Sequence, residues 1–383
     1  MQETTKRNSC VICASETLKE IYAVDRFPVY MGITATPDLA RYDKLEYRKC
    51  ETCSALQLGQ LIPLAILYHS NHNAEVVGEI WKGHFRRFSE FILQKADSKS
   101  VLEIGDPSAK LAKRCLKNNG EWTIVEPNFN SSILDTLLPR IKYEQVWFAD
   151  FNVQDKKYDT VVLSHVFEHL YDPVKTLNKI SRCITADGKL LLSIPNMEYL
   201  LQRGHMPPGG MHFEHTYYLS LDNLKFLLNR CGFEIEAYEK YLNHSLFISC
   251  AKKSEIISED PSALANSNDR ACYKMKKVMK SFEAAVVQIN KTIESTSLPV
   301  YMYGAHFPAQ LLLSMGIKEE SIVGILDNSA DKIGKYLYGT SLKVQSPRIL
   351  RGKKAVVICH MGAYTDEIKA DIIDNISDHI IFI

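Results

Sequence analysis

The sequence lacks the features that would place it in a membrane, in an oxidising compartment or on nucleic acid. No apolar run approaches the ~20 residues of a transmembrane helix, and the first residues lack the apolar core of a signal peptide. Lys and Arg number 46 and Asp and Glu 45, so the formal net charge of +1 gives no attraction to nucleic acid or acidic membranes. Six cysteines are scattered, mostly among apolar neighbours, which favours reduced thiols and a cytoplasmic protein.

A G-x-G-x-x-G motif is also absent, which argues against a dinucleotide cofactor. The chain of 383 residues is long enough for two or three domains, and its 46% hydrophobic and 24% charged residues are ordinary for a globular protein. Composition therefore narrows the class of protein without indicating an activity.

The other four cysteines form two C-x-x-C pairs, Cys10 with Cys13 and Cys50 with Cys53. Two residues between paired thiolates let each pair bind the same ion, and four thiolates complete a tetrahedral zinc site. A zinc ion with four protein ligands has no open position for chemistry. The pattern therefore predicts a structural zinc module over residues 1–60, with the chemistry elsewhere.

Short apolar strands alternate with helices after this module, which predicts a parallel, doubly wound α/β sheet over residues 61–252. A polar linker and a long helix are expected over 253–296, and a second, smaller Rossmann-like α/β domain over 297–383. The strands expected in the central domain are 100–105, 122–126, 145–149, 158–164 and 188–194, with a late strand at 243–250.

The strand-to-helix turn of the central domain has features of a cofactor site. Glu103 and Gly105 lie in the segment 101–109, and a glycine there lets the backbone approach a ligand. Glu126 ends the next strand, where a carboxylate can bind both ribose hydroxyls. Asp150 lies where a carboxylate could receive an adenine amino group. Together these residues resemble class I S-adenosylmethionine-dependent methyltransferases.

The segment 164–173, Ser-His-Val-Phe-Glu-His-Leu-Tyr-Asp-Pro, strengthens the resemblance, because EHL-x-DP after the fourth strand is frequent in that superfamily. His165 is counted among the cofactor residues, with packing or capping of the next helix as its alternative. The sequence departs from the superfamily in its first motif, which keeps only Gly105 and has Pro107 and Ala109 where small, flexible residues are usual.

The order of the parts resembles the three-domain sugar C-methyltransferases, which act on nucleotide-linked deoxy-4-keto sugars. Supporting segments are 50–58, 67–70, 211–220, 301–305, 325–329 and 334–340. The resemblance implies S-adenosylmethionine and structural zinc, with a nucleotide sugar as partner. It implies that His215 is the base, that Glu214 supports it, that His169 binds the keto oxygen and that Tyr68 reaches over the substrate. The family's tyrosine before the Glu-His pair is replaced here, by His212 and Phe213.

Several alternatives stay open. Glu214 and His215 could instead be an N-cap or turn beside the helix at Leu221. A histidine base also suits O-methylation of a sugar, and a binding or assembly protein that has lost turnover is a third hypothesis. Gly209 and Gly210 predict a mobile lid. In the last domain, the amides of Ala309 and Gln310 could meet a phosphate. The sugar, the nucleotide and the oligomeric state cannot be read from the sequence.

Overall fold

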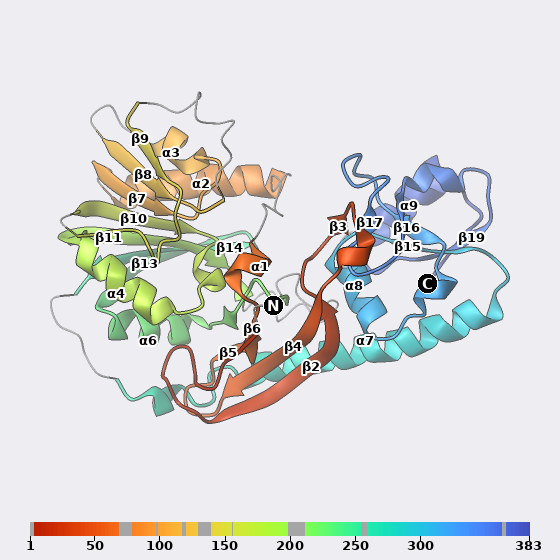
Figure 1. Ribbon diagram of the computed structural model, residues 1–383, viewed down its shortest axis with the longest axis horizontal. Helices are drawn as coiled ribbons and strands as arrows, with labels where there is room; N and C mark the ends of the chain where they lie inside the picture. The colour runs from red at the N-terminus through yellow and green to blue at the C-terminus, as the bar shows by residue number, and fades with distance from the viewer. Residues whose placement is uncertain are drawn as a thin grey trace.

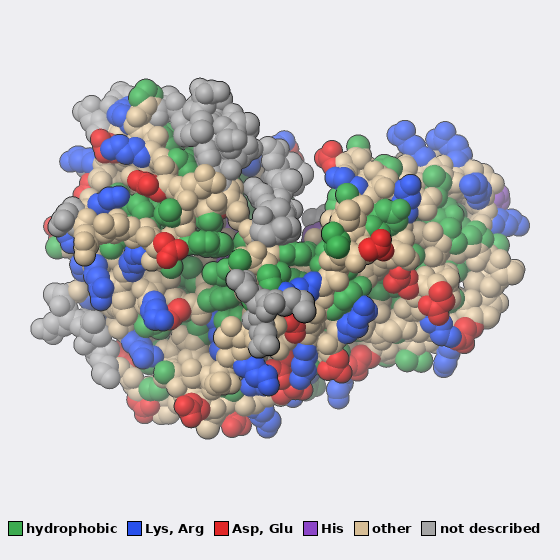
Figure 2. All heavy atoms as spheres, in the orientation of Figure 1, with side chains coloured by type: hydrophobic (Ala, Val, Ile, Leu, Met, Phe, Trp, Pro, Cys, Tyr) green, Lys and Arg blue, Asp and Glu red, His purple; other side chains and the backbone are tan. Residues whose placement is uncertain are grey.

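The computed structural model describes residues 4–68, 79–96, 99–116, 120–128, 139–154, 156–197, 211–253, 259–361 and 365–383. Two α/β lobes lie side by side and are joined by a long β-ribbon and a long helix (Figure 1). The ribbon consists of β2 (Leu18–Pro28) and β4 (Tyr42–Cys50), and the helix is α7 (Asp269–Ser295). Positive and negative side chains are interspersed over the face in Figure 2, in keeping with the small net charge.

The N-terminal module is an antiparallel sheet that takes its last strand from the central lobe. Its order is β12-β5-β4-β2, where β5 is Leu56–Leu58 and β12 is Tyr217–Tyr218. Tyr217 pairs with Gln57 and Tyr218 with Leu56. The remaining short elements of the module are β1 (Thr5–Lys6), which pairs with β6 (Gln60–Leu61), β3 (Ile33–Thr34), which pairs with β17 (Tyr336–Leu337), and the helix α1 (Leu64–Leu67). The module is therefore hydrogen-bonded to both lobes.

The central lobe contains a seven-stranded mixed sheet of order β13-β14-β11-β10-β7-β8-β9. Its strands are β7 (Ser100–Ile104), β8 (Glu121–Val125), β9 (Ile141–Glu144), β10 (Tyr158–Ser164), β11 (Ile184–Pro195), β13 (Phe233–Tyr241) and β14 (Ser245–Lys252). Strand β14 runs in the direction opposite to that of the other six strands. The chain order reverses between β7 and β10, as in a Rossmann-like sheet. The expected strand over 145–149 is wrong: β9 ends at Glu144, and a turn follows in which Asp150 N–H donates to the carbonyl of Trp147.

Helices cover both faces of this sheet because alternate strand residues point to opposite sides. On one face, α2 (Glu79–Lys95) and α3 (Lys110–Cys115) pack on a cluster that includes Trp122 and Phe247. On the other, α4 (Pro173–Cys183) and α6 (Leu221–Arg230) pack on a cluster that includes Leu163 and Leu192. No helix among the described residues is long and apolar enough to cross a membrane.

The C-terminal lobe is a smaller parallel sheet of order β18-β16-β15-β19-β20. Its elements are β15 (Val300–Tyr303), α8 (Phe307–Ser314), β16 (Gly324–Leu326), β18 (Val344–Gln345), β19 (Ala355–Ile358), α9 (Thr365–Asn375) and β20 (Ile380–Phe382). Its core continues through α7 into the N-terminal module, where Phe27 packs against Phe307 with ring centroids 5.7 Å apart. The cysteine end of the same module belongs instead to the core of the central lobe.

Candidate active site

The first strand of the central sheet ends in a turn that favours glycine. Gly105 follows β7 with φ of 84°, and its N–H donates to the carbonyl of Val125 at 2.9 Å. A Cβ at this position would lie 2.5 Å from Cγ2 of Val166, in the segment after β10. Since the strand order reverses between β7 and β10, the turn lies at the edge where doubly wound sheets bind ligands.

Asp106 helps this turn to form with a single glycine. Its carboxylate accepts the N–H of Ser108 at 2.7 Å and that of Lys110 at 2.9 Å, so it satisfies amides at the start of α3. Ala109 takes the left-handed conformation, with φ of 54°, that a glycine would adopt more easily. The sequence comparison with the superfamily missed Asp106, although an Asp before a helix is a recognisable capping signal.

Glu126 follows β8 with one carboxylate oxygen engaged and the other available. Oε1 accepts the N–H of Asn128 at 2.7 Å, and within the described ranges no donor bonds Oε2. Burial raises the pKa of Glu126 to about 7. The amide of Asn128 also donates to the carbonyl of Tyr68 at 3.1 Å, which links this strand end to the segment after the N-terminal module.

The other two acidic residues predicted to bind cofactor are in contrasting surroundings. Glu103 is buried, accepts the indole N–H of Trp122 at 2.7 Å, and has its pKa raised by burial. Asp150 is exposed, in the turn beyond β9. The roles of Glu103 and Asp150 in cofactor binding stay predictions.

His165 belongs to a group of three histidines that sequence reasoning missed. Its φ of 52° is left-handed, and its Nε2 is hydrogen-bonded to Ser245 at 2.8 Å. The same hydroxyl contacts Nδ1 of His244 at 2.6 Å, and the rings of His84 and His165 lie 5.0 Å apart. Trp81 packs edge-on against all three rings. Burial lowers the pKa of His84 to about 2, of His165 to about 3 and of His244 to about 4, so the group is neutral.

The predicted catalytic side chains do come together. The Tyr68 hydroxyl is hydrogen-bonded to Nδ1 of His169 at 2.8 Å, and the His169 ring lies 4.9 Å from that of His215. Burial raises the pKa of Tyr68 and lowers the pKa values of His169 and His215, which keeps all three groups neutral. The three residues come from the end of α1, the segment after β10 and the segment before β12, so tertiary structure alone brings them together.

Glu168 is a fourth member of this group, and the sequence analysis gave it no role. It is 4% exposed, and its carboxylate oxygen lies 3.3 Å from Nδ1 of His165 and 3.9 Å from Nε2 of His169. One donor atom each from Glu168, His169 and His215 lies within 4.8 Å of the others. Burial raises the pKa of Glu168 to about 7. The signal that could have found it is its place beside His169 in the EHL segment.

Backbone hydrogen bonds hold the two halves of the group together. The N–H of Thr216 donates to the carbonyl of Glu168 at 2.9 Å, and its hydroxyl donates to the carbonyl of Leu170 at 2.7 Å. The guanidinium of Arg7 donates to the carbonyls of Thr216 at 2.7 Å and Tyr171 at 2.9 Å. The N-terminal module thus fixes the segment that carries His215.

Glu214 and His215 do not cap the next helix. Ser220 is the N-cap of α6, and its hydroxyl accepts the N–H of Asn223 at 3.2 Å. Glu214 is buried, and its N–H donates to Nδ1 of His212 at 3.2 Å. The His212 ring lies 4.4 Å from that of His215, so His212 is part of the same histidine-rich group. The lid predicted at Gly209 and Gly210 lies outside the described residues.

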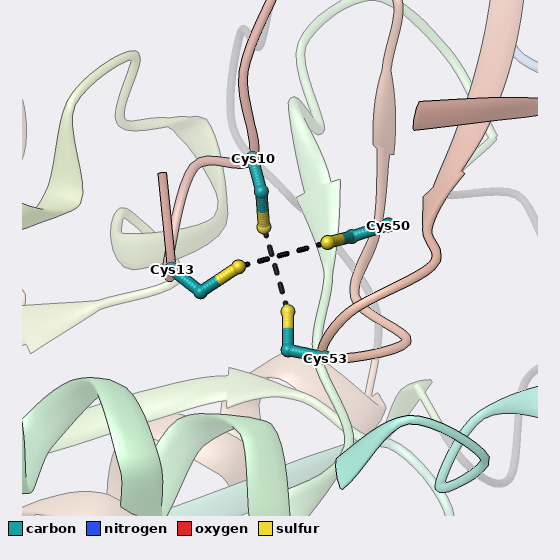
Figure 3. Close-up of side chains that lie close together, drawn as sticks. All are labelled: Cys10, Cys13, Cys50 and Cys53. Carbon is teal, nitrogen blue, oxygen red and sulfur yellow. Dashed lines mark hydrogen bonds between the residues drawn. The ribbon is translucent and has the colours of Figure 1, made fainter. Parts of the chain in front are cut away.

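The four N-terminal cysteines converge from two matched turns (Figure 3). The N–H of Ala14 donates to the carbonyl of Cys10 at 3.0 Å, and the N–H of Ser54 donates to that of Cys50 at 2.9 Å. Ala14 and Ser54 are both left-handed, with φ of 64° and 62°. Each C-x-x-C therefore closes in the same way, which aims its two thiols at a common centre.

The spacing of the sulfurs suits a tetrahedral ion. Sγ of Cys10 lies 3.5 Å from that of Cys53, and Sγ of Cys13 lies 3.6 Å from that of Cys50. Zinc–sulfur bonds of about 2.3 Å place tetrahedral sulfurs roughly 3.8 Å apart. A cation at the centre would stabilise all four groups as thiolates.

Asn223, Arg230 and Asn268 attach this cluster to the central lobe. The amide of Asn223 donates to the carbonyl of Cys53 at 2.7 Å, and Arg230 donates to that of Ile12 at 2.5 Å. The Asn268 amide, just before α7, donates to the carbonyl of Ser54 at 3.0 Å. The cysteine cluster thus lies at a junction of the N-terminal module, α6 and α7.

Comparison with known proteins gives the central lobe its family. Residues 78–238 match the sequence model of a family described as "Methyltransferase domain". No curated protein matches the chain significantly.

Several solved methyltransferase structures resemble part of the chain. A putative S-adenosylmethionine-dependent methyltransferase from Listeria monocytogenes is 15% identical, with 45% of this chain and 100% of that chain covered and a TM-score of 0.36. The 1,6-didemethyltoxoflavin-N1-methyltransferase of Burkholderia thailandensis, bound to S-adenosylhomocysteine, is 14% identical, with 46% and 82% covered and a TM-score of 0.38. A riboflavin-analogue dimethyltransferase from Streptomyces davawensis is 17% identical, with 45% and 56% covered and a TM-score of 0.38.

The sequence match covers the Gly105 turn, Glu126 and the histidine-rich group around His169 and His215. These residues lie on a sheet with the strand reversal of a Rossmann-like fold. The central lobe of this chain therefore contains a methyltransferase domain with a Rossmann-like sheet.

Proposed function

We propose that the protein transfers a methyl group from S-adenosylmethionine to a carbon atom of a nucleotide-linked keto-deoxysugar. The observation that carries the proposal is the meeting of Tyr68, His169 and His215 beside the Gly105 edge of the methyltransferase sheet. Methylation of carbon requires a carbanion equivalent, and a proton next to a ketone is acidic enough for a neutral histidine to remove. A neutral base and a hydrogen-bond donor at one site match that requirement.

Two features of this chain fit the cofactor. Gly105 gives the left-handed turn at the edge of the sheet where such folds bind ligands, and Oε2 of Glu126 can accept from a ribose hydroxyl. When bound, S-adenosylmethionine supplies an electrophilic methyl group. Glu126 orients the nucleoside end, and the neutral histidines His84, His165 and His244 add no positive charge that would repel the sulfonium.

Different side chains of the catalytic group act on different atoms of the substrate. His215 removes the proton from the carbon next to the ketone, and its lowered pKa means that the free ring starts in the neutral form. Neutral Tyr68 and neutral His169 each carry one polar hydrogen, and the hydrogen bond between them uses one of the two. The other hydrogen can be donated to the keto oxygen as negative charge develops there. Glu214 supports His215 from the neighbouring position in the chain.

The cysteine cluster has a structural role in this proposal. Cys10, Cys13, Cys50 and Cys53 hold one zinc ion, which fixes the module whose Arg7 supports the His215 segment. Because all four ligands come from the protein, the ion takes no part in methyl transfer.

The test begins with calorimetry against S-adenosylmethionine and S-adenosylhomocysteine, in which binding of neither would refute the enzyme. Keto and reduced nucleotide sugars are then compared as substrates by mass spectrometry. Loss of an α-deuterium label during methylation supports attack by carbon, whereas its retention with methylation of a reduced sugar indicates O-methylation.

His215→Ala should lower turnover by about 10²- to 10⁴-fold, the usual contribution of a general base, with cofactor affinity nearly unchanged. His379→Ala is the matched control, since His379 is exposed in the C-terminal lobe. An unchanged rate in His215→Ala would show that another group takes the proton.

A further inference from the structure

Glu168 is a buried carboxyl group that has no hydrogen-bonding partner among the described residues. Its side chain is 5% exposed, and neither oxygen has a hydrogen bond within the described part of the chain. The nearest donor, Nδ1 of His165, is at 3.3 Å without hydrogen-bond geometry. A buried carboxylate left in this state is costly, so an ordered fold that retains one points to a partner acquired in another state.

His215 has a ring nitrogen that also lacks a hydrogen-bonding partner among the described residues. This nitrogen, Nδ1, is buried, and the ring contributes to the same 4.8 Å group as Glu168. An imidazole that takes a proton at one nitrogen carries N–H on both, and the second N–H needs an acceptor. The two unpaired groups therefore match: Glu168 can accept what a protonated His215 must donate.

The backbone sets the separation of the two side chains. Thr216, next to His215, donates its N–H to the carbonyl of Glu168 at 2.9 Å, and the Tyr217 hydroxyl donates to the carbonyl of Phe167. These bonds fasten the two segments directly beside the two side chains. A rotation of either side chain can then shorten their contact, as catalytic hydrogen bonds often do when substrate binds.

We infer that Glu168 is a positioning residue whose carboxylate accepts the Nδ1–H of His215 while Nε2 of that ring receives the substrate proton. The inference rests on the proposed function and identifies the carboxylate partner of its base. The C–H electron pair stays on the substrate as an enolate and then forms the bond to the transferred methyl, while the electrons of the broken S–CH3 bond remain on sulfur. The proton stays on His215 and is later released to solvent.

The surroundings of Glu168 make this pairing sensitive to its charge. His165 and His169 face it from its own segment, His215 and Tyr217 from the segment around β12, and Tyr68 from the end of α1. The rest of its small cavity is apolar, lined by Phe167, Ile194, Pro195, Met197, Leu219 and Leu224. Burial raises the pKa of Glu168 to about 7, so the carboxyl group is partly ionised near neutral pH and its charge depends on its neighbours.

The test replaces the carboxylate by its neutral isostere, Glu168→Gln. With wild-type enzyme, substrate and S-adenosylhomocysteine in D2O, NMR follows exchange of the α-proton without methyl transfer. Glu168→Gln should slow this exchange by about 10- to 100-fold, change KM little and remove the acidic limb of the pH–rate profile. Glu168→Asp should recover part of the rate, and the exposed Glu236→Gln is the matched control.

A second measurement does not depend on the substrate. NMR titration of labelled histidines, with His215 assigned from the spectrum of His215→Asn, should show the pKa of His215 falling by about one pH unit in Glu168→Gln. An unchanged His215 pKa would overturn the inference even if no sugar is methylated. If wild type neither exchanges nor methylates any keto sugar while this shift is present, only the proposed function fails.

Two other results would also overturn the inference. One is an exchange rate in Glu168→Gln equal to that of wild type. The other is a metal content of two ions per chain that falls to one in Glu168→Gln, because a cation rather than a proton would then join Glu168, His169 and His215.

Discussion

The two α/β lobes build the same turn at the end of their first strand. Gly105 in the central lobe and Gly304 in the C-terminal lobe have φ of 84° and 93°. Their N–H groups donate to the last residue of the second strand, at 2.9 Å to Val125 and 2.8 Å to Leu326. An acidic residue follows directly in both lobes. The backbone at the ends of the first two strands is therefore closely matched in the two lobes.

The lobes differ in the hydrogen bonds that the carboxylate of this acidic residue accepts. Glu126 and Asp327 each accept the N–H two residues further on, at 2.7 and 2.9 Å. Asp327 uses its second oxygen within the protein, where it accepts from Ala305 N–H and from Lys332, both at 2.9 Å. No donor among the described residues bonds the second oxygen of Glu126. Among the described residues, the second carboxylate oxygen is thus hydrogen-bonded in the C-terminal lobe and not in the central lobe.

Both turns are crowded, and the helix that follows the C-terminal turn uses its first amides within the protein. A Cβ at Gly304 would lie 2.3 Å from the sulfur of Met361, and one at Gly105 would lie 2.5 Å from Cγ2 of Val166, so neither turn has room for a side chain. The amides of Ala309 and Gln310, expected to meet a phosphate, donate to the carbonyl of His306. That expectation is wrong for this state, because the first turn of α8 uses both donors.

Removal of the proposed zinc ion should have the largest effect, because it should destabilise both lobes. The N-terminal module belongs to the cores of both lobes, so Cys50→Ala should lower the free energy of unfolding by more than about 5 kcal/mol, within the range of structural zinc sites. Metal content and urea unfolding measure the change. Cys359→Ala, a buried cysteine outside the cluster, should retain one zinc per chain. Full stability of metal-free protein would contradict the zinc assignment.

Gly105→Ala and Gly304→Ala test whether the matched turns have different uses. An alanine at positive φ costs roughly 1–2 kcal/mol, and at Gly105 its Cβ also meets the stiff side chain of Val166. We expect calorimetry to show a fall of about 100-fold in affinity for S-adenosylmethionine for Gly105→Ala. Gly304→Ala should lower stability and leave this affinity unchanged. Equal effects on affinity would mean that the lobes do not act separately.

Glu126→Gln and Asp327→Asn sharpen the contrast between the two carboxylates. Loss of a charged acceptor for the ribose should weaken cofactor binding about tenfold, close to 1.4 kcal/mol. Asp327→Asn should leave cofactor binding intact and lower the free energy of unfolding by about 1–3 kcal/mol, since Lys332 and Ala305 lose their acceptor. Calorimetry and urea unfolding on both variants separate these outcomes. A cofactor affinity that falls with Asp327→Asn would refute the division of roles.

The pH dependence of stability should follow the buried histidines. His84, His165 and His244 in the central lobe, and His306 in the C-terminal lobe, have pKa values lowered to between about 2 and 4. The unfolded chain binds their protons first, near pH 6.5, so stability should fall as pH drops from about 6.5 to 4.

Glu126 and Glu168 act in the opposite sense, because their pKa values are raised to about 7. Their contribution is fully present below the unfolded value near 4.5 and is lost as pH rises toward 7. The histidines are more numerous, so a net acid destabilisation should remain. Urea midpoints at pH 7, 6, 5 and 4 measure it, and His84→Phe should reduce the slope by at most one proton. A stability that rises on acidification would contradict the balance.

The sequence predicts the helices, the strands and the cysteine cluster of this protein better than it predicts which residues meet in the folded chain. Cysteine spacing and strand–helix alternation are local patterns, and both appear in the structure. Residues that meet across the fold, such as His84 with His165 and Glu168 with His215, leave no local trace, because strand order and loop pairing bring them together. The strand expected at 145–149 failed because apolar residues in a turn resemble those of a short strand.

Strand β12 belongs to the central lobe but completes the sheet of the N-terminal module, which affects how the chain folds during its synthesis. The N-terminal module contains its cysteines by residue 53, but its sheet lacks a strand until Tyr217 and Tyr218 have left the ribosome, and β3 waits for Tyr336 and Leu337. The first part of the chain to be made is therefore among the last to be completed. Until then its strand edges are open to pairing with other chains. A nascent chain that ends before β12 should need a chaperone, whereas the full chain closes those edges itself.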